Sequence, residues 1–232
     1  MIDEGLDILA RRNAGALTPL AFLDLDIPLW PGLHVVTGDV GAGKSQLALQ
    51  AAICAARHGV VTAVNTPLAS VAETTARLLG LVNDASWSAI YAGDLGVDAG
   101  AISSLPLAIR AAPTDETLVV TDRCPRHIDR DREQTVIATV DAPTKLDAAS
   151  LMDLPADRVL THVQLDPELV AAADTVFVLA TMPPHEPNAW RGARLAVAHR
   201  RAGVPRWIDL RFDGTRFERE AEEIQIEFDA ES

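Results

Sequence analysis

The sequence predicts an α/β protein whose mainly parallel β-sheet is flanked by helices and ends in a C-terminal β-hairpin. Three observations lead to this fold class. Segments rich in β-branched residues alternate along the chain with segments of helical periodicity. The strand segments are continuously apolar, which is typical of strands buried on both faces. Ten aromatic residues in a chain that is 48% hydrophobic indicate a core of small aliphatic side chains, which favours helices packed closely on a sheet.

The predicted elements follow one another from residue 33. Apolar, β-branched segments predict strands over residues 33–37, 60–65, 117–122, 135–141 and 175–181. Helical periodicity predicts helices over residues 44–59, 70–81 and 165–174. In the second helix, Ser70 fits an N-cap and Glu73 completes a capping box. The last two predicted strands, which form the hairpin, are residues 192–203 and 205–218.

One domain accounts for most of the chain, since the sequence has no internal repeat and no low-complexity linker. Residues 1–15 are predicted to form an N-terminal arm with apolar residues at helical spacing, packed either on its own domain or on a neighbouring subunit. Residues 16–217 form the domain itself. Residues 218–232 form an acidic tail with seven acidic side chains and one arginine, which supplies −6 of the formal net charge of −13.

The composition excludes several classes of protein. Cys54 and Cys124 form no C-x-x-C pair, so neither a disulfide scaffold nor a zinc ribbon is expected. The N-terminus is acidic where a secretory signal would be basic, and no run of about 18 apolar residues could span a membrane. We therefore expect a soluble, cytoplasmic protein with no membrane partner. The acidic balance gives no electrostatic support to nucleic-acid binding.

Residues 38–45 read Gly-Asp-Val-Gly-Ala-Gly-Lys-Ser and satisfy the phosphate-loop (Walker A) pattern G-x-x-x-x-G-K-[ST], between a predicted strand and a predicted helix. The glycines let backbone N–H groups surround phosphate oxygens, and the helix directs its positive end at the same anion. Lys44 is expected to contact the β- and γ-phosphates of ATP, and the Ser45 hydroxyl is expected to bind Mg²⁺. The predicted nucleotide-binding residues are Gly38, Asp39, Val40, Gly41, Ala42, Gly43, Lys44, Ser45 and Gln46.

A second magnesium ligand is expected at the end of another apolar strand. Asp122 ends the predicted strand 117–122 and fits this Walker B role, in which its carboxylate holds the metal through water. An aspartate at a strand end can instead form a turn. Because the phosphate loop is present, we favour the metal role.

Beyond the loop, the chain resembles the RecA-like ATPases, and among them the DnaB-type replicative helicases and single-domain plasmid helicases. The resemblance covers residues 18–217, and its motifs occur in the family's order. Residues 19–26 (PLAFLDLD) resemble the G-F-x-x-L-D motif, and residues 30–38 (WPGLHVVTG) resemble the P-G-x-L lead into the loop. Residues 170–180 resemble the late A-D-hydrophobic strand, and residues 198–218 resemble the K-x-R-x-G hairpin and the strand after it.

The resemblance implies a ring or filament, in that family a hexamer, with ATP between subunits and an arginine finger supplied in trans. By position that finger is Arg201, while the family's lysine two residues earlier is His199 here. The catalytic set would be Lys44, Asp122 and Arg201, with Asp141 where the family has a polar sensor. A finger arginine stabilises charge on the transferring phosphoryl group.

The chain departs from the RecA-like pattern at the catalytic glutamate, which would orient the attacking water. The matching position falls near Leu68, and Asp122 is followed by Arg123 instead of a glutamate. Asp141 and Glu73 are acidic residues that could substitute, although each also has a structural interpretation. The sequence therefore predicts nucleotide binding more strongly than fast hydrolysis.

Nucleic-acid contacts are expected from Arg123, Arg126, Arg130 and Lys145, although the three arginines also fit a solvated, salt-bridged segment because acidic residues lie among them. The leading hypothesis is a motor ATPase, a helicase or helicase-like subunit, acting on single-stranded nucleic acid. One alternative is a hydrolysis-deficient ATP-binding switch or regulatory subunit. Another is a GTPase, because residues 144–147 (Thr-Lys-Leu-Asp) resemble the guanine-reading [NT]-K-x-D motif, in which Asp147 would bind the base.

Overall fold

The computed structural model of the chain describes most of the predicted domain. The predicted N-terminal arm and residues 221–232 of the acidic tail lie outside the described residues. The described ranges are 20–23, 27–65, 68–94, 96–110, 116–122, 134–183, 191–200 and 204–220.

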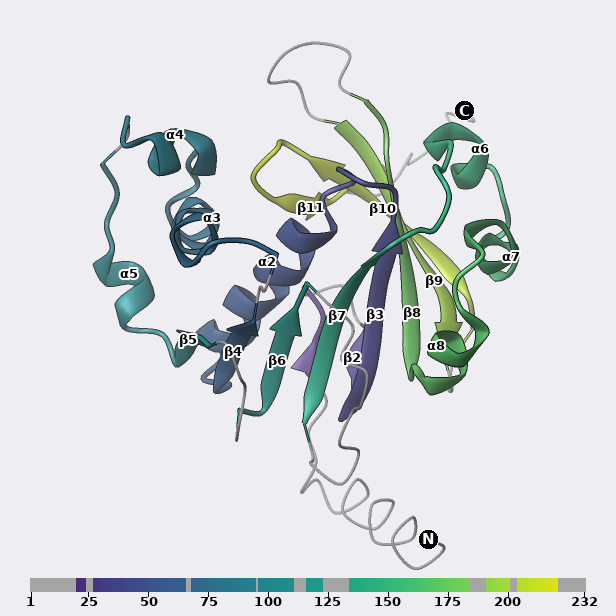
Figure 1. Ribbon diagram of the computed structural model, residues 1–232, viewed down its shortest axis with the longest axis horizontal. Helices are drawn as coiled ribbons and strands as arrows, with labels where there is room; N and C mark the ends of the chain where they lie inside the picture. Colours follow the sequence, from purple (N-terminus) through teal and green to yellow (C-terminus); the bar gives the residue numbers. More distant parts are fainter. Residues whose placement is uncertain are drawn as a thin grey trace, which may run out of the picture.

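In these ranges, nine strands form one sheet in the order β11-β10-β9-β8-β3-β7-β6-β4-β5 (Figure 1). The six strands from β8 to β5 are parallel, and β9, β10 and β11 extend the sheet in antiparallel fashion. The strands are β3 (Gly32–Gly38), β4 (Thr62–Asn65), β5 (Leu107–Ile109), β6 (Leu118–Thr121), β7 (Thr135–Asp141), β8 (Thr175–Thr181), β9 (Arg191–Arg200), β10 (Arg206–Phe212) and β11 (Phe217–Arg219). A separate two-stranded sheet pairs β1 (Leu20–Ala21) with β2 (Pro28–Leu29).

Helices lie on both sides of the sheet (Figure 1). The first group is α2 (Lys44–Arg57), α3 (Val71–Asn83), α4 (Trp87–Ala92) and α5 (Gly100–Ser103), in which α4 and α5 pack on α3. The second group is α6 (Ala148–Met152), the 3₁₀ turn η1 (Ala156–Arg158), α7 (Val159–Val163) and α8 (Pro167–Ala172). None of the described helices has the length and apolar character needed to cross a membrane.

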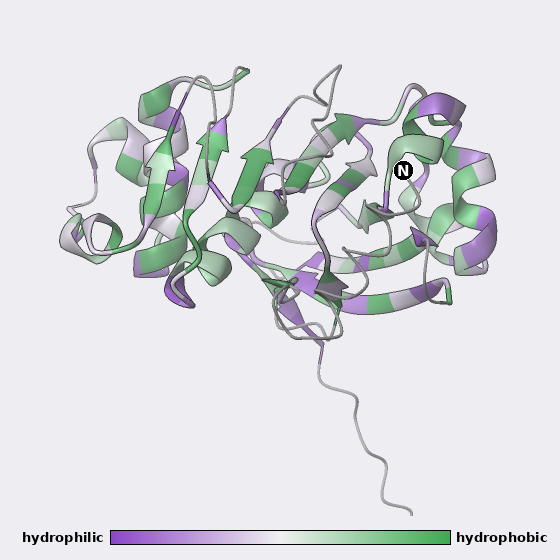
Figure 2. Ribbon diagram, turned by 90° about the horizontal axis from the view of Figure 1, so that it is seen from below, coloured by the Kyte–Doolittle hydropathy of each residue, from purple (hydrophilic) through white to green (hydrophobic). Residues whose placement is uncertain are grey.

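The strands are continuously apolar because both of their faces are buried. In β3, Val36 packs in the cluster that contains Leu47 of α2, whereas its neighbour Val35 packs in the cluster that contains Val159 of α7. Successive side chains of a strand point to opposite faces, so a sheet covered twice needs apolar residues at every position. Figure 2 shows hydrophobic residues along the central strands and hydrophilic residues on the outer helices. The predicted α/β class with a mainly parallel sheet is confirmed.

The strands predicted over 135–141 and 175–181 have those bounds in the structure, as β7 and β8. Ser70 is the N-cap of α3, where its hydroxyl accepts the Glu73 backbone N–H at 3.0 Å. The Glu73 carboxylate makes an ion pair with Arg77, one helical turn further on, at 2.6 Å.

One strand prediction was wrong. Residues 205–218 were expected to form a single strand, but the structure divides them into β10 and β11. Gly214 turns the chain with a φ of +94°, which glycine adopts readily. The Asp213 carboxylate accepts the backbone N–H groups of Thr215 and Arg216 at 2.7 and 2.8 Å, and this closes the turn. The predicted hairpin of β9 and β10 is followed by this third antiparallel strand.

We expect Gly38→Ala to lower the free energy of unfolding by roughly 3 kcal/mol, from steric overlap and backbone strain together. Gly38 ends β3 with a φ of +153°, and a Cβ there would lie 2.3 Å from the Leu179 carbonyl oxygen of β8. Urea denaturation measures the change. Gly192→Ala in β9 is the control, because a Cβ at Gly192 meets no atom within 4 Å. Equal stability of the two variants would contradict the prediction.

Candidate functional site

The phosphate loop connects β3 to α2 and carries its glycines at positions that need them. Gly41 and Gly43 have φ values of +80° and +93°, in the left-handed region that favours glycine. Gly43 is the N-cap of α2 and supplies no side-chain hydrogen bond to the helix. The first N–H groups of α2 are therefore available to an anion, where the helix dipole also favours negative charge.

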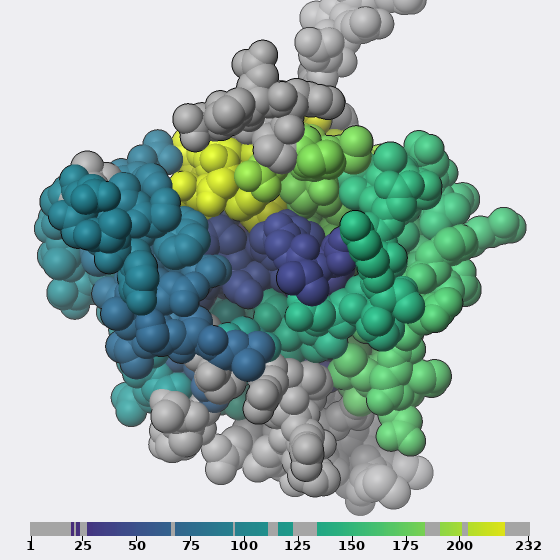
Figure 3. Space-filling view, turned by 45° about the horizontal axis from the view of Figure 1, so that its top comes forward, coloured from purple at the N-terminus to yellow at the C-terminus, as the bar shows by residue number. Residues whose placement is uncertain are grey.

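A cavity of about 440 Å³ opens at this helix end. Residues from the phosphate loop, α2, α3, α4, β7, β9 and β10 line it together with Asp122, which follows β6. The lining residues include Gly41, Gly43, Lys44, Ser45, Gln46, Leu68, Glu73, Arg77, Trp87, Asp122, Thr139, Asp141, Arg191, Phe212 and Gly214. Figure 3 shows this face, with the phosphate loop and the start of α2 at its centre, framed by α3 and α4, by the C-terminal strands and by α6. Strands from different parts of the sequence thus contribute to a single site.

Lys44 is buried at the base of the cavity, and its ammonium group has an acceptor for each of its three donors. It donates to the backbone carbonyls of Gly38 at 3.2 Å and Asp39 at 2.6 Å, and its third contact is an ion pair with the Asp141 carboxylate at 2.8 Å. The Lys44 side chain is 7% exposed, whereas that of Asp141 is 62% exposed. The contact with Asp141 therefore lies on the open side of the lysine.

Ser45 and Asp122 line the same cavity although 76 residues separate them in the sequence. Asp122 directly follows β6, and its carboxylate accepts the Leu68 backbone N–H at 3.3 Å. A hydroxyl and a carboxylate are hard oxygen ligands of the kind that Mg²⁺ prefers, and Mg²⁺ usually takes one or two carboxylates together with substrate phosphates. The described residues contain no group of three or more acidic, histidine or cysteine side chains that could hold a metal by themselves. The residues present fit a metal that a bound nucleotide helps to hold.

The predicted gap at the glutamate position can be located in the structure. Leu68 lines the cavity beside Asp122 with 65% of its surface exposed, so an apolar side chain stands where the resemblance implies a carboxylate. Glu73 lines the same cavity, but its carboxylate is held by Arg77, whose guanidinium lies 4.6 Å from the Trp87 ring centroid. Glu73 therefore interacts with Arg77, which in turn contacts Trp87 of α4.

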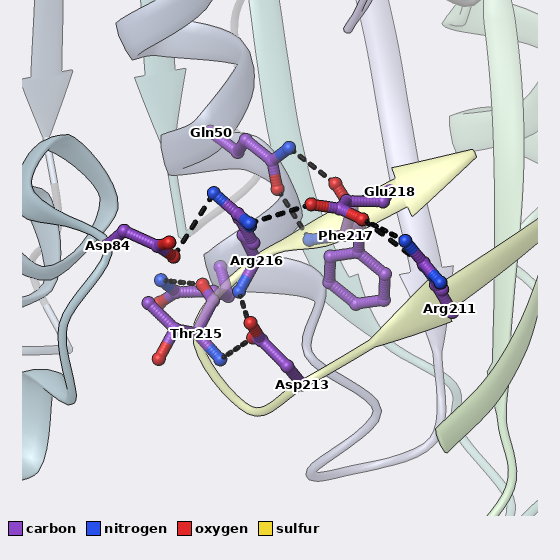
Figure 4. Close-up of polar contacts among 9 residues, drawn as sticks. Gln50, Asp84, Arg211, Asp213, Thr215, Arg216, Phe217 and Glu218 are labelled. Carbon is purple, nitrogen blue, oxygen red and sulfur yellow. Dashed lines mark hydrogen bonds and ion pairs between the residues drawn. The ribbon is translucent and has the colours of Figure 1, made fainter. Parts of the chain in front are cut away.

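The turn between β10 and β11 forms another wall and is bonded to α2 (Figure 4). The Gln50 side chain donates to the Phe217 carbonyl at 2.7 Å and accepts the Phe217 backbone N–H at 2.8 Å, as a neighbouring strand would. Gln46, which follows Ser45, donates to the Thr215 carbonyl. The Phe217 and Phe212 rings stack with centroids 4.2 Å apart beside Gly43. The C-terminal turn thus packs directly on the helix that begins at the phosphate loop.

Ion pairs connect the same turn to α3 and to β10 (Figure 4). Arg216 contacts Asp84, the C-cap of α3, at 3.1 Å and Glu218 at 2.8 Å. Arg211 of β10 also donates to Glu218 at 2.7 Å. These contacts join the turn to the C-terminal end of α3.

A second cavity lies on the other side of the phosphate loop, lined by Asp39–Ala42, by residues 145–149 and by the end of β8. Asp147, the residue predicted to read guanine in the GTPase alternative, is the N-cap of α6. Its carboxylate accepts hydrogen bonds from the Ser150 hydroxyl and, at 3.4 Å, from the Ser150 backbone N–H. These bonds lower the pKa of Asp147, the hydroxyl contributing most. Helix capping accounts for this aspartate without a nucleobase.

Arg191, which starts β9 and lines both cavities, was not among the residues predicted from the sequence. Its guanidinium lies 5.8 Å from the Phe212 ring centroid. The antiparallel return of β9 brings it to the phosphate loop, and no local motif marks it. Four predicted site residues, Arg123, Arg126, Arg130 and Arg201, lie outside the described residues.

No protein-family model and no curated protein matches the chain. Among solved structures, it is similar to the ATPase domain of the protein G40-P, with 15% identity and a TM-score of 0.68 over 95% of this chain and 99% of that one. It is also similar to a DnaB-like replicative helicase, whose structure was described together with its interactions with primase, with 15% identity and a TM-score of 0.59. That match covers 81% of this chain and 58% of the helicase chain. The chain has the RecA-like fold of DnaB-type ATPase domains.

We expect Asp147→Ala to lower the thermal stability without changing the relative affinity for ATP and GTP, because the carboxylate caps α6. The pKa of Asp147 is lower in the folded chain than in the unfolded one, so the cap stabilises the fold above the unfolded pKa. That stabilisation is lost as the pH falls through the folded pKa. Unfolding transitions at neutral and acidic pH, with competition binding of the two nucleotides, measure both effects. A selective loss of GTP binding would support the GTPase alternative instead.

Proposed function

We propose that the protein is an ATP-binding motor ATPase of the RecA/DnaB type that acts on single-stranded nucleic acid as a helicase or helicase-like subunit. The observation that carries the proposal is the convergence of the phosphate loop, Lys44, Ser45 and Asp122 on one cavity at the uncapped start of α2. The similarity to DnaB-type ATPase domains supports this class. A buried lysine at a helix N-terminus provides concentrated positive charge for phosphate in an otherwise acidic chain.

In this proposal, the loop residues Gly38–Gln46 bind the nucleotide phosphates, with the Lys44 ammonium on the β- and γ-phosphates. Ser45 and Asp122 hold Mg²⁺, which supplies positive charge to the phosphate oxygens when it is bound. The Asp141 carboxylate lies where it can sense the terminal phosphate, since it already contacts Lys44. ATP is the expected nucleotide, because the aspartate of the guanine-reading pattern caps a helix.

The geometry of β9 supports a finger arginine that acts on a neighbouring subunit. Ala193 of β9 pairs with Thr181 at the phosphate-loop end of β8, whereas Arg200 pairs with Thr175 at the opposite end. Seven residues at about 3.3 Å each separate these ends by roughly 23 Å. Arg200 also donates to the Pro28 carbonyl at 3.4 Å. We therefore assign the finger to Arg201, which follows β9, and place its target in a second copy of the chain within a ring or filament.

Nucleic-acid contacts are proposed for the segments that leave the carboxyl ends of β6 and β7. Arg123, Arg126 and Arg130 follow Asp122 in sequence, and Lys145 follows β7 and lines the second cavity. Both segments leave the sheet at the edge that carries the phosphate loop, because β6, β7 and β3 are parallel. Nucleotide state and nucleic-acid binding would therefore be coupled through one edge of the sheet.

A second candidate function is a hydrolysis-deficient ATP-binding switch within a larger assembly. The exposed Leu68 at the position of the usual glutamate favours this candidate. Steady-state ATP turnover with and without single-stranded DNA separates the two functions. DNA-stimulated turnover supports the motor, and tight ATP binding without turnover supports the switch.

We expect Lys44→Ala to weaken ATP binding by roughly a hundredfold, because a charge-assisted contact to phosphate is lost from a buried site. Titration with a fluorescent ATP analogue in Mg²⁺ buffer measures the affinity, and circular dichroism confirms the fold. Lys145→Ala removes the other lysine of the chain and serves as the control, with ATP affinity unchanged in the absence of DNA. Unchanged affinity in Lys44→Ala would refute the phosphate-loop assignment.

We expect Arg201→Ala to lower DNA-stimulated turnover by about a hundredfold or more while ATP binding persists, because a finger arginine acts mainly on the transition state. Mixing Arg201→Ala with Lys44→Ala should restore part of the turnover, since some interfaces then join an intact loop to an intact finger. Arg200→Ala is the neighbouring control. A mixture no more active than its components would argue against action in trans.

A further inference from the structure

Among the described residues, three carboxylates line the cavity at the phosphate loop, and they differ in what holds them. They are Glu73 of α3, Asp122 after β6 and Asp141 at the end of β7. Glu73 is paired with Arg77 at 2.6 Å within its own helix. Asp122 accepts the Leu68 N–H and has the proposed magnesium role. Asp141 is the carboxylate in contact with the phosphate-binding lysine, at 2.8 Å.

The sheet places Asp141 between the phosphate loop and Asp122, the proposed magnesium ligand. In the strand order, β7 lies between β3, which leads into the phosphate loop, and β6, which leads to Asp122. Asp141 pairs in register with Gly38, and the backbone N–H of Ala142 donates to the Gly38 carbonyl at 3.0 Å. Neighbouring strands lie about 4.8 Å apart, so the end of β7 is one strand away from the end of β3 and one strand away from the end of β6. Leu68, by contrast, follows β4 on the far side of β6.

The contacts of Lys44 indicate what happens to Asp141 when a nucleotide binds. All three donors of the ammonium group are in use, so a phosphate oxygen can gain one only by replacing an existing acceptor. The two backbone carbonyls are part of the loop itself, whereas the Asp141 side chain is 62% exposed and can be rehydrated when released. Asp141 therefore competes with phosphate for Lys44, and its carboxylate is left beside the terminal phosphate once the phosphate has replaced it.

We propose that Asp141 is the catalytic carboxylate that orients and deprotonates the attacking water, in place of the glutamate that the chain lacks. The assignment rests on the proposed ATPase function. The water oxygen forms a bond to the γ-phosphorus while the bond from that phosphorus to the β,γ-bridging oxygen breaks, and its electron pair leaves with ADP. One proton of the water passes to the Asp141 carboxylate and then to solvent, which regenerates the carboxylate. The products are ADP and inorganic phosphate.

The charge pattern of the cavity is consistent with a carboxylate in this position. Lys44 and Arg191 are cations that line the cavity together with Asp141. The unfavourable proximity of a carboxylate to phosphate is offset when a cation lies beside both, because the attraction of the cation to each anion opposes the repulsion between them. A carboxylate there lowers the affinity for ATP, and general-base action compensates in the chemical step.

The test compares two carboxylate-to-amide variants of the same cavity, Asp141→Asn and Glu73→Gln, in the full chain. A fluorescent ATP analogue gives the affinity, and single-turnover hydrolysis with excess protein gives the chemical step, both with Mg²⁺ and with single-stranded DNA. We expect Asp141→Asn to bind ATP severalfold more tightly and to hydrolyse it at least about a hundredfold more slowly, the typical contribution of a general base. Glu73→Gln should retain turnover within a fewfold range. Asp141→Glu keeps the carboxylate and should recover part of the rate.

The outcomes separate this inference from the function on which it rests. Normal turnover in Asp141→Asn overturns the role of Asp141 and leaves the ATPase intact, and loss of turnover confined to Glu73→Gln does the same. Lys44-dependent ATP binding without turnover in the unchanged protein overturns the motor ATPase itself. Slow hydrolysis with tighter binding in Asp141→Asn, with a thermal unfolding curve like that of the unchanged protein, supports the assignment.

Discussion

The site depends on the hydrogen bonding of β3 between two parallel strands, β7 and β8. This pairing fixes the level at which β3 ends and brings Gly38 so close to the Leu179 carbonyl that no side chain fits there. From that point the chain can only turn outward, through two glycines in left-handed conformations, and start α2 over the edge of the sheet. The open end of α2, the buried Lys44 and the cavity all follow from this arrangement.

Parallel pairing also brings the proposed functional residues together at one edge of the sheet. Asp122 and Asp141 are distant from the phosphate loop in sequence, yet each comes at or just after the carboxyl end of a strand parallel to β3. In an open sheet of this kind, such ends lie together and ligands bind beside them. The antiparallel strands β9 to β11 add a different element, since they return to the same edge with Arg191 and with the turn that packs on Gln46 and Gln50.

The sequence predicted the features that depend on local pattern. The central strands are buried on both faces, so their apolar segments mark their bounds well, and the phosphate loop is contiguous. The helices from α4 to α7 have four to six residues, too few for a periodic signal, whereas α8 lies within the helix predicted over residues 165–174. The turn after β10 was missed although the pair Asp213-Gly214 is a local turn signal in the sequence. Arg191, and the pairing of Gln50 with a residue 167 positions away, result from long-range packing that no short pattern encodes.

The exposed Leu68 and the contact between Lys44 and Asp141 together indicate where the negative charge of the site lies. A carboxylate after β4 would lie on the far side of Asp122 from the phosphate loop. It would not form an ion pair with Lys44. A carboxylate at the end of β7 instead makes an ion pair with the lysine at 2.8 Å, so the buried cation has an acidic partner. In the proposed ATPase, phosphate binding must then break an existing ion pair. The affinity for ATP would thereby be reduced, and the carboxylate would be released as the terminal phosphate arrives beside it.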